Sequence, residues 1–344
     1  MASNFWLHDH FCKPLTQIDA ATVRTWQMND VGSCQFALSP SDPKFSEMNV
    51  QYGNLVRIEH IPSSSANGKL PDWVGIILPR RVWNKSMVSM AAFSAEAILT
   101  LRPMPWVRVE GTPRTIFLKI LEYAAQADSN IVIQPGVVDD VNQTLTDDLR
   151  SSAYDHIIQI VKKTGMTWNV TGYVGKDGRL ELYANLLLEP GVDTGVELNN
   201  LNSQLRSPIL VDDGIPHNVV IGHSFDVTQR ARFIRDAVNG SSLTDYGYMG
   251  INKTFTGLHD PSSVGFAAQV EANTFGRPLK TTDRGILDVG KTFDACRIGN
   301  LLRLDEKEAG FLPGGGIGIQ GPIRVLRMEY DDLVGIVETK MEVL

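Results

Sequence analysis

Cysteine is scarce in this chain, and an excess of positive charge and long apolar runs are both missing. The 344 residues include three cysteines, Cys12, Cys34 and Cys296, which lie far apart in the sequence. An odd number of distant cysteines predicts neither a disulfide framework nor a cysteine-ligated metal site, and favours synthesis in a reducing cytoplasm. The formal net charge of -7 argues against a nucleic-acid reader, because such proteins need a basic surface.

Signals for membrane insertion and secretion are also missing. The longest weakly charged apolar stretch, residues 86–95, ends at Glu96 and is much shorter than the roughly 20 residues of a membrane-spanning helix. The first ten residues have neither the basic nor the apolar segment of a signal peptide, so we expect no cleaved leader. With 43% hydrophobic and 21% charged residues the composition is globular, and the length predicts two or three domains.

Short segments of alternating polarity predict a meander of antiparallel strands over residues 22–104. Turn residues separate these segments, and the polar stretch 62–69 is expected to be a hairpin loop. The expected strands cover residues 25–38 with a break at 30–32, then 54–61, 73–79 and 87–101.

Helical patterns replace the strand patterns in the middle of the chain. Thr112 and Pro113 form a helix start ahead of apolar residues at helical spacing, which predicts a helix over 113–127. A second helix is expected over 151–164, and Asp177-Gly178 predicts a hairpin between strands 167–174 and 179–187. Further along, we expect a strand at 219–225, helices at 228–238 and 262–274, and short strands over the last 60 residues.

An internal repeat is the most informative feature of the sequence. Residues 53–59 and 299–305 share four identities in seven, and residues 72–77 and 332–337 share four in six. Alternation places Val56 and Ile58, and likewise Leu302 and Leu304, on one face of a strand. We interpret the two blocks as two copies of one antiparallel β-barrel; the alternative is a chance match between generic hairpins.

The predicted fold is therefore mainly β with an α+β part: two related antiparallel β-barrels flank a small α+β middle region. The expected domains are residues 1–109 for the first barrel, 110–200 for the α+β domain, and 201–344 for the second barrel with its helices.

Two motifs that can signal cofactor or metal binding have simpler interpretations here. Residues 316–321 match Gly-x-Gly-x-x-Gly, but Pro322 and the strand pattern after it are incompatible with the helix that a dinucleotide site requires. His8, Asp9 and His10 could supply metal ligands, yet the other histidines are scattered, which favours a polar amino-terminal strand or arm. We therefore expect no cofactor and no metal.

Catalytic residues are not predicted either. Four acidic pairs could suggest paired carboxylates, but each lies beside an expected turn or helix start, where aspartate makes local hydrogen bonds. These pairs are Asp139-Asp140, Asp147-Asp148, Asp212-Asp213 and Asp331-Asp332. No nucleophile motif is present, so we predict a protein that is not an enzyme.

The order of segments resembles that of the tail-tip or baseplate hub proteins of tailed bacteriophages. The resemblance lies in residues 25–32 leading into 36–38, then the Gly53–Arg57 strand, then 73–77 and 97–102, which run like the first barrel of such hubs. The helix at 113–127 and the helix and hairpin at 151–187 are similar to the middle domains of that family.

This resemblance implies a structural hub in the virion, at the tail tip or baseplate. It implies a homotrimer whose six similar barrels join the sixfold tail tube or distal tail ring to the tip and close the channel until DNA ejection. The implied partners are the distal tail protein or tube hexamer, the tape measure protein and tail fibres or receptor-binding proteins, with DNA only in transit. The alternatives are a lytic or peptidase tail component and a receptor- or glycan-binding tail protein.

Overall fold

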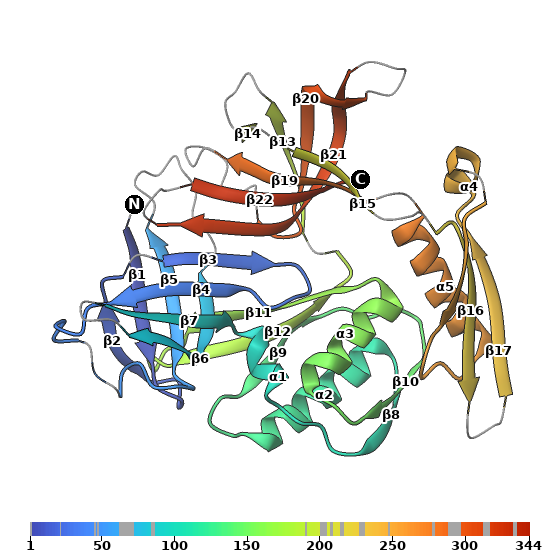
Figure 1. The fold of residues 1–344 in the computed structure, drawn as a ribbon. Coiled ribbons are helices and arrows are strands. Elements are labelled where there is room, and N and C mark those ends of the chain that lie inside the picture. Colours follow the sequence, from blue (N-terminus) through green and yellow to red (C-terminus); the bar gives the residue numbers. More distant parts are fainter. Residues whose placement is uncertain are drawn as a thin grey trace.

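The computed structural model is dominated by strands (Figure 1). The residues that it describes are 2–20, 22–44, 46, 48–61, 72–83, 87–189, 191–199, 205–206, 209–213, 217–226, 231–246, 248–276, 279–287, 297–311, 317–332 and 336–344. They form one 14-stranded sheet and three small sheets, together with five helices. The mainly β fold class is thus confirmed. The expected loop at 62–69 lies outside the described residues.

The large sheet joins the two ends of the chain. Its main path runs β14-β19-β22-β21-β3-β4-β7-β6-β5-β1-β2, and β13, β15 and β20 attach beside it. The amino-terminal strands are β1 (Ala2–His8), β2 (Pro14–Ile18), β3 (Thr22–Gln27), β4 (Ser33–Leu38), β5 (Leu55–Ile61), β6 (Trp73–Trp83) and β7 (Val88–Ser94). The later strands are β13 (Asp193–Asn199), β14 (Leu205–Arg206), β15 (Ile209–Asp213), β19 (Leu279–Leu287), β20 (Leu301–Phe311), β21 (Ile317–Asp331) and β22 (Ile336–Val343).

A compact α+β unit follows β7. Its elements are α1 (Glu96–Thr100), β8 (Val107–Gly111), α2 (Pro113–Ala127), β9 (Ile133–Val138), β10 (Leu145–Leu149), α3 (Ala153–Thr164), β11 (Thr167–Val174) and β12 (Leu180–Leu187). The Thr112 side chain caps α2, Ser152 and Asp155 form a capping box on α3, and Gly165 ends α3 with a φ of 72°. Both predicted helices and the hairpin are confirmed, whereas the expected strand 87–101 ends at Ser94 and continues as α1.

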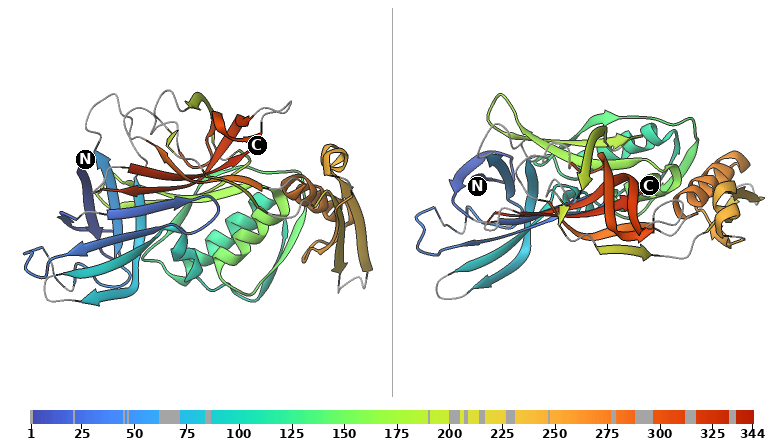
Figure 2. Two further views of the ribbon diagram at one scale, coloured as in Figure 1. Left: turned by 45° about the horizontal axis from the view of Figure 1, so that its top comes forward. Right: turned by 90° about the horizontal axis from the view of Figure 1, so that it is seen from above.

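A second small unit is inserted between β15 and β19, at the end of the molecule away from the amino terminus (Figures 1 and 2). It contains β16 (Val219–Asp226), β17 (Ala231–Val238), α4 (Gly240–Tyr246), β18 (Gly250–Thr254) and α5 (Pro261–Phe275). The expected strand at 219–225 and the helix at 262–274 are confirmed. The helix expected at 228–238 is wrong, because Ala231–Val238 pairs along its whole length with β16. Tertiary pairing there outweighs local helix propensity.

Three clusters of buried apolar side chains hold the molecule together. One lies among β1–β7 and includes Phe5 and Ile58, and a second lies among β13 and β20–β22 and includes Leu304. The third and largest lies beneath α1–α3 and extends to α5. Trp26 packs against both sheet clusters, so the cores formed by the two ends of the chain are in contact through this side chain. Among the described residues neither region forms a closed barrel, because the strand path of the large sheet runs from β14 to β2 without returning on itself.

Glu96 is a buried carboxylate at the start of α1, where the large sheet meets the α+β unit. Burial raises the pKa of Glu96 above its ordinary value of 4.5, and hydrogen bonds from Ser94 and the Val170 N–H (2.8 Å) oppose this shift. A carboxyl group with a raised pKa binds more protons in the folded state, so stability falls as the pH rises above 4.5.

We expect Glu96→Gln to reduce this pH-dependent loss of stability, measured as denaturation midpoints from pH 4.5 upward. Glu122→Gln, at an exposed ion pair with Lys119, is the control, and identical profiles for Glu96→Gln and the unmodified chain contradict the prediction.

Candidate functional site

The large sheet contains two copies of a five-stranded unit in the same chain order. The first repeat is β3, β4, β5, β6 and β7, and the second repeat is β15, β19, β20, β21 and β22. In space the strands are ordered β5-β6-β7-β4-β3 in the first repeat and β20-β21-β22-β19-β15 in the second. The unit of β16–β18, α4 and α5 is inserted after the first strand of the second repeat, where the first repeat has only a short turn.

The Gly-Asn turns of the two repeats have matching geometry. Gly53 and Gly299 adopt φ values of 89° and 87°, a region that favours glycine. The Gly53 N–H donates to the Ile77 carbonyl (2.9 Å), and the Gly299 N–H donates to the Val325 carbonyl (2.8 Å). In return, the N–H groups of Ile77 and Val325 donate to the carbonyls of Asn54 (2.9 Å) and Asn300 (3.2 Å). The repeat of residues 53–59 at 299–305 is therefore structural.

The second sequence block does not mark equivalent strands. Residues 72–77 lie in or beside β6, which pairs with β5, whereas Ile336 and Val337 begin β22, which pairs with β21 and β19. The structural counterpart of Trp73–Ile77 is residues 321–325 of β21, opposite Leu301–Leu304. Both sequences alternate in polarity after an aspartate, a pattern common to many strands, so residues 72–77 and 332–337 are similar in sequence without being equivalent in the structure. Residues 317–321 of the glycine motif lie within β21, so strand and not helix follows it, and Gly316 lies outside the described residues.

The two repeats are joined to each other through β3 and β21. These strands pair antiparallel, from Gln27 opposite Arg327 to Val23 opposite Asp331. Two further backbone hydrogen bonds close the ends of this joint: the Met28 N–H donates to the Leu326 carbonyl and the Asp332 N–H to the Thr22 carbonyl, both at 2.9 Å. The joint makes one sheet from segments about 300 residues apart in sequence, a separation that local sequence patterns cannot reveal.

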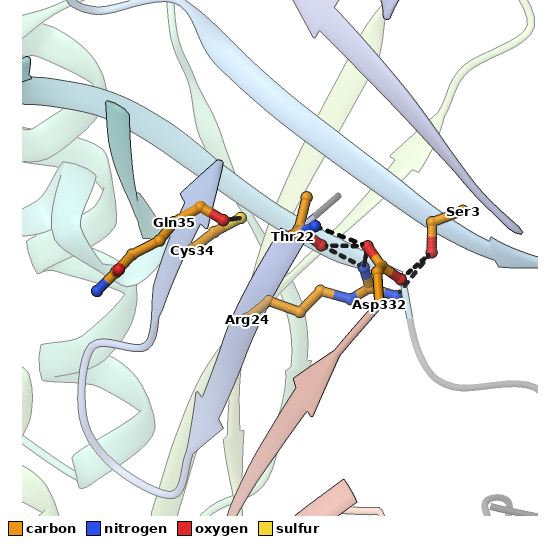
Figure 3. Close-up of polar contacts among 6 residues, drawn as sticks. All are labelled: Ser3, Thr22, Arg24, Cys34, Gln35 and Asp332. Carbon is orange, nitrogen blue, oxygen red and sulfur yellow. Dashed lines mark hydrogen bonds and ion pairs between the residues drawn. The ribbon is translucent and has the colours of Figure 1, made fainter. Parts of the chain in front are cut away.

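A buried ion pair lies at the joint (Figure 3). Arg24 Nη1 on β3 lies 3.1 Å from Asp332 Oδ2, and the two side chains are 1% and 7% exposed. The Thr22 hydroxyl donates to the same carboxylate oxygen at 2.5 Å, and the Ser3 hydroxyl donates to the other at 2.8 Å. Arg24 Nη2 also donates to Ser3 Oγ (3.1 Å). Strands β1 and β3 and the end of β21 thus share one polar network.

Aromatic rings complete the surroundings of Arg24. Its guanidinium carbon lies 4.8 Å from the centre of the Tyr330 ring and 5.7 Å from that of Trp26. Such contacts stabilise a cation that is withdrawn from water. Burial raises the pKa of Tyr330 to about 12, and the Asp332 carboxylate adds to this shift, so the phenol stays neutral. At the joint, the buried positive charge of Arg24 is therefore balanced by the Asp332 carboxylate.

Three of the four acidic pairs can be compared with the expected turn and cap roles; Asp212 and Asp213 lie in β15, and their side chains are outside the described part of the structure. Asp140 accepts from the Val141 N–H (3.0 Å) and from the Arg114 N–H (3.2 Å) at the start of α2, which agrees with a turn and helix-start role, whereas Asp139 accepts from the Leu188 N–H, 49 residues further along the chain. Asp332 instead pairs with Arg24, and Asp147 lies within β10 and contacts His156, so the turn interpretation is wrong for both. Arg24 was not singled out from the sequence, because it lies one residue before the expected strand 25–38; in the structure it falls within β3.

Ser151, His156 and Asp147 are connected in the order of a hydrolytic triad. His156 Nδ1 lies 2.9 Å from Asp147 Oδ2, and Ser151 Oγ lies 3.2 Å from His156 Nε2. However, the backbone N–H groups of Arg150 and Ser151 donate to the same Nε2, at 3.0 and 3.3 Å. A general base needs that lone pair free to take a proton. The arrangement fastens the turn before α3 to β10 and supports a structural role.

The amino-terminal His-Asp-His segment forms a turn. Asp9 accepts hydrogen bonds from the N–H groups of Phe11 (2.9 Å) and Lys13 (2.8 Å), and His8 is buried beside the Cys12 carbonyl. Among the residues that the structure describes, no three His, Cys, Asp or Glu side chains are grouped as metal ligands. None of the helices in the described part of the chain combines the length and apolar character needed to cross a bilayer.

The fold of this chain is shared with solved tail proteins of prophages. The chain is similar to prophage tail protein gp18 from Listeria monocytogenes, at a TM-score of 0.62 and 9% identity over 98% of this chain and 94% of that one. The 43 kDa tail protein of prophage MuSo2 from Shewanella oneidensis gives a TM-score of 0.61 at 10% identity over 99% and 98%.

A tail protein from Neisseria meningitidis gives 0.60 at 12% identity over 100% of this chain and 97% of that one. No family model and no curated protein matches the sequence. The resemblance noted from the order of segments is thus confirmed by the fold, along almost the whole length of the chain.

Proposed function

We propose that this protein is a structural hub of a phage tail, a homotrimeric ring at the tail tip or baseplate. The ring joins the sixfold tail tube or distal tail ring to the tip and closes the channel until DNA is ejected. The fold it shares with phage tail proteins supports a role in the virion. The observation that carries the ring is the colinear pair of repeats, joined edge to edge through β3 and β21.

Two similar repeats in one chain allow a threefold assembly to contact a sixfold partner. Three copies of the chain present six similar units, so a threefold ring can contact a sixfold ring through nearly equivalent surfaces. In this proposal the regions 1–109, 110–200 and 201–344 carry the first repeat, the α+β unit and the second repeat. The barrel expected from the sequence then closes between copies, and not within one chain.

The proposed partners follow from this position in the tail. One face of the ring contacts the distal tail protein or the tube hexamer, and the other meets the tape measure protein and the fibres or receptor-binding proteins. DNA passes through without being held, in keeping with a net charge of -7. The role is structural and not enzymatic, consistent with the occupied lone pair of His156.

End-on images of the purified chain, classified without imposed symmetry, test the proposal. We expect threefold rings with six lobes around a pore, at a solution mass near that of three 38.0 kDa chains, about 114 kDa. A chain that stays monomeric at every concentration contradicts the ring and favours a lytic or a receptor-binding tail component. A closed dimer contradicts it as well, because four repeats cannot match a sixfold partner.

A further inference from the structure

The joint between the repeats uses one edge of β3 and one edge of β21. The equivalent edges, on β15 in the second repeat and on β6 in the first, have no partner among the described residues. In the first repeat, β3 pairs with β4 on one edge and with β21 on the other. Its counterpart β15 pairs with β19, and its other edge has no partner in the part of the chain that the structure describes. In the second repeat, β21 is bordered by β22 on one edge, and on the other edge by β20 and then β3. Its counterpart β6 pairs with β5 beside residues 73–76, and beyond Ile77 no described residue pairs with that edge.

We propose that β15 of one copy pairs antiparallel with the open edge of β6 in the next copy, and so repeats between chains the joint that β3 and β21 make within the chain. This inference rests on the proposed ring and identifies the contact that closes it. The contact is head to tail, and such contacts form closed rings when the rotation between copies fits. Strand addition to an open edge also satisfies backbone groups that are otherwise a liability.

The register of the contact follows from matching the repeats strand by strand. Leu210 of β15 is equivalent to Arg24 of β3, because the residues paired with them across the neighbouring strands are equivalent. Leu210 pairs with Thr282, which pairs with Met341; Arg24 pairs with Cys34, which pairs with Ala92. In β6, Trp83 occupies the place of Tyr330 in β21, since they lie opposite Val88 and Val337 respectively.

Within the chain, Arg24 lies opposite Tyr330 and Thr25 opposite Glu329. Copying that register places Leu210 opposite Trp83, Val211 opposite Val82, and Asp212 opposite Arg81 of the next copy.

Charge and exposure agree with this register. The sequence of β15 ends in Asp212-Asp213, and β6 carries Arg80-Arg81, so the copied register sets two acidic positions near two basic ones. Opposite charges across strands stabilise a pairing, and like charges oppose it. Val82 is 60% exposed in the single chain, a large open fraction for an apolar side chain in a strand. The contact would cover it with Val211 of the neighbouring copy.

A disulfide between opposed positions tests the pairing and its register. Directly opposed residues in antiparallel strands have Cα atoms about 4.5–5.5 Å apart, within the range that a disulfide spans. We expect the full chain carrying Val82→Cys and Val211→Cys to give covalent dimers and trimers after mild oxidation, which reduction returns to monomers. Cys296→Ser is included in every variant, since Cys12 and Cys34 are buried.

The matched control is Val82→Cys with Leu210→Cys. A shift of one residue turns the side chain to the other face of the strand, so this pair should cross-link only at background level. A charge exchange gives a second readout: Arg81→Asp alone and Asp212→Arg alone should each shift the assembly to monomers, and the two changes together should restore it. Far-UV circular dichroism spectra that match the spectrum of the unmodified chain would show that each variant remains folded, since the melting temperature itself is expected to fall when the assembly dissociates.

The outcomes separate this contact from the proposed function. An oligomer of three chains that forms no disulfide at positions 82 and 211, or that survives both single charge changes, overturns the contact and leaves the ring intact. A chain that stays monomeric at every concentration and never cross-links overturns the ring and the contact together. Equal cross-linking of the test pair and the shifted control overturns the register.

Discussion

Asp332→Ala is expected to lower the free energy of unfolding by about 3–5 kcal/mol, because it leaves the Arg24 guanidinium buried without its carboxylate. Arg24 is 1% exposed, so water cannot replace the lost partner. The substitution also removes the acceptor for the hydroxyl groups of Ser3 and Thr22. Urea denaturation followed by tryptophan fluorescence measures the loss, and Trp26, which lies beside Arg24, reports directly on the joint.

The matched control is Asp72→Ala. Asp72 accepts two hydrogen bonds from Arg57, at 3.0 and 2.6 Å, but these side chains are 20% and 15% exposed. Its removal should cost about 1 kcal/mol or less, because water can solvate the remaining charge. Arg24→Met combined with Asp332→Leu should recover most of the stability, since both buried charges are then gone. Equal losses for Asp332→Ala and Asp72→Ala would show that the buried pair does not hold the joint.

Local sequence signals were sufficient to predict a helix where neighbouring residues supply hydrogen bonds to the backbone groups at its ends. The capping residues Thr112 and Ser152 fixed the starts of α2 and α3, and Gly165 fixed the end of α3, so these helices could be predicted almost to the residue. The same reasoning failed for β17, whose residues have fair helix propensity. Its strand conformation depends on hydrogen bonds to β16, which no local pattern encodes.

The internal repeat was predictable only where it depends on unusual backbone geometry. The Gly-Asn turns recur because a positive φ at Gly53 and Gly299 restricts the residue type, so the sequence retains the match. Ordinary strands need only alternation, which many sequences satisfy, and the second block was therefore aligned with the wrong strand. The pairing of β3 with β21 left one sheet where two barrels were expected, because alternation indicates a strand but not its partner.

Ile58→Ala and Leu304→Ala are each expected to lower the free energy of unfolding by about 2–5 kcal/mol. Both side chains are fully buried, Ile58 in the core of the first repeat and Leu304 in that of the second. They occupy equivalent places in the two Gly-Asn strands, so the alanine changes leave equivalent cavities. Chemical denaturation gives the size of each loss, and hydrogen exchange shows which repeat loses protection.

Matched substitutions at exposed sites separate burial from residue type. Ile234→Ala and Leu188→Ala, at side chains 46% and 48% exposed, should cost less than about 0.5 kcal/mol. Losses below about 1 kcal/mol at both buried positions would contradict the strand register of the repeats. Because Ile58 and Leu304 lie in separate clusters, their effects should add within about 0.5 kcal/mol. A larger departure would mean that the two cores interact, with Trp26, which packs against both clusters, as their shared contact.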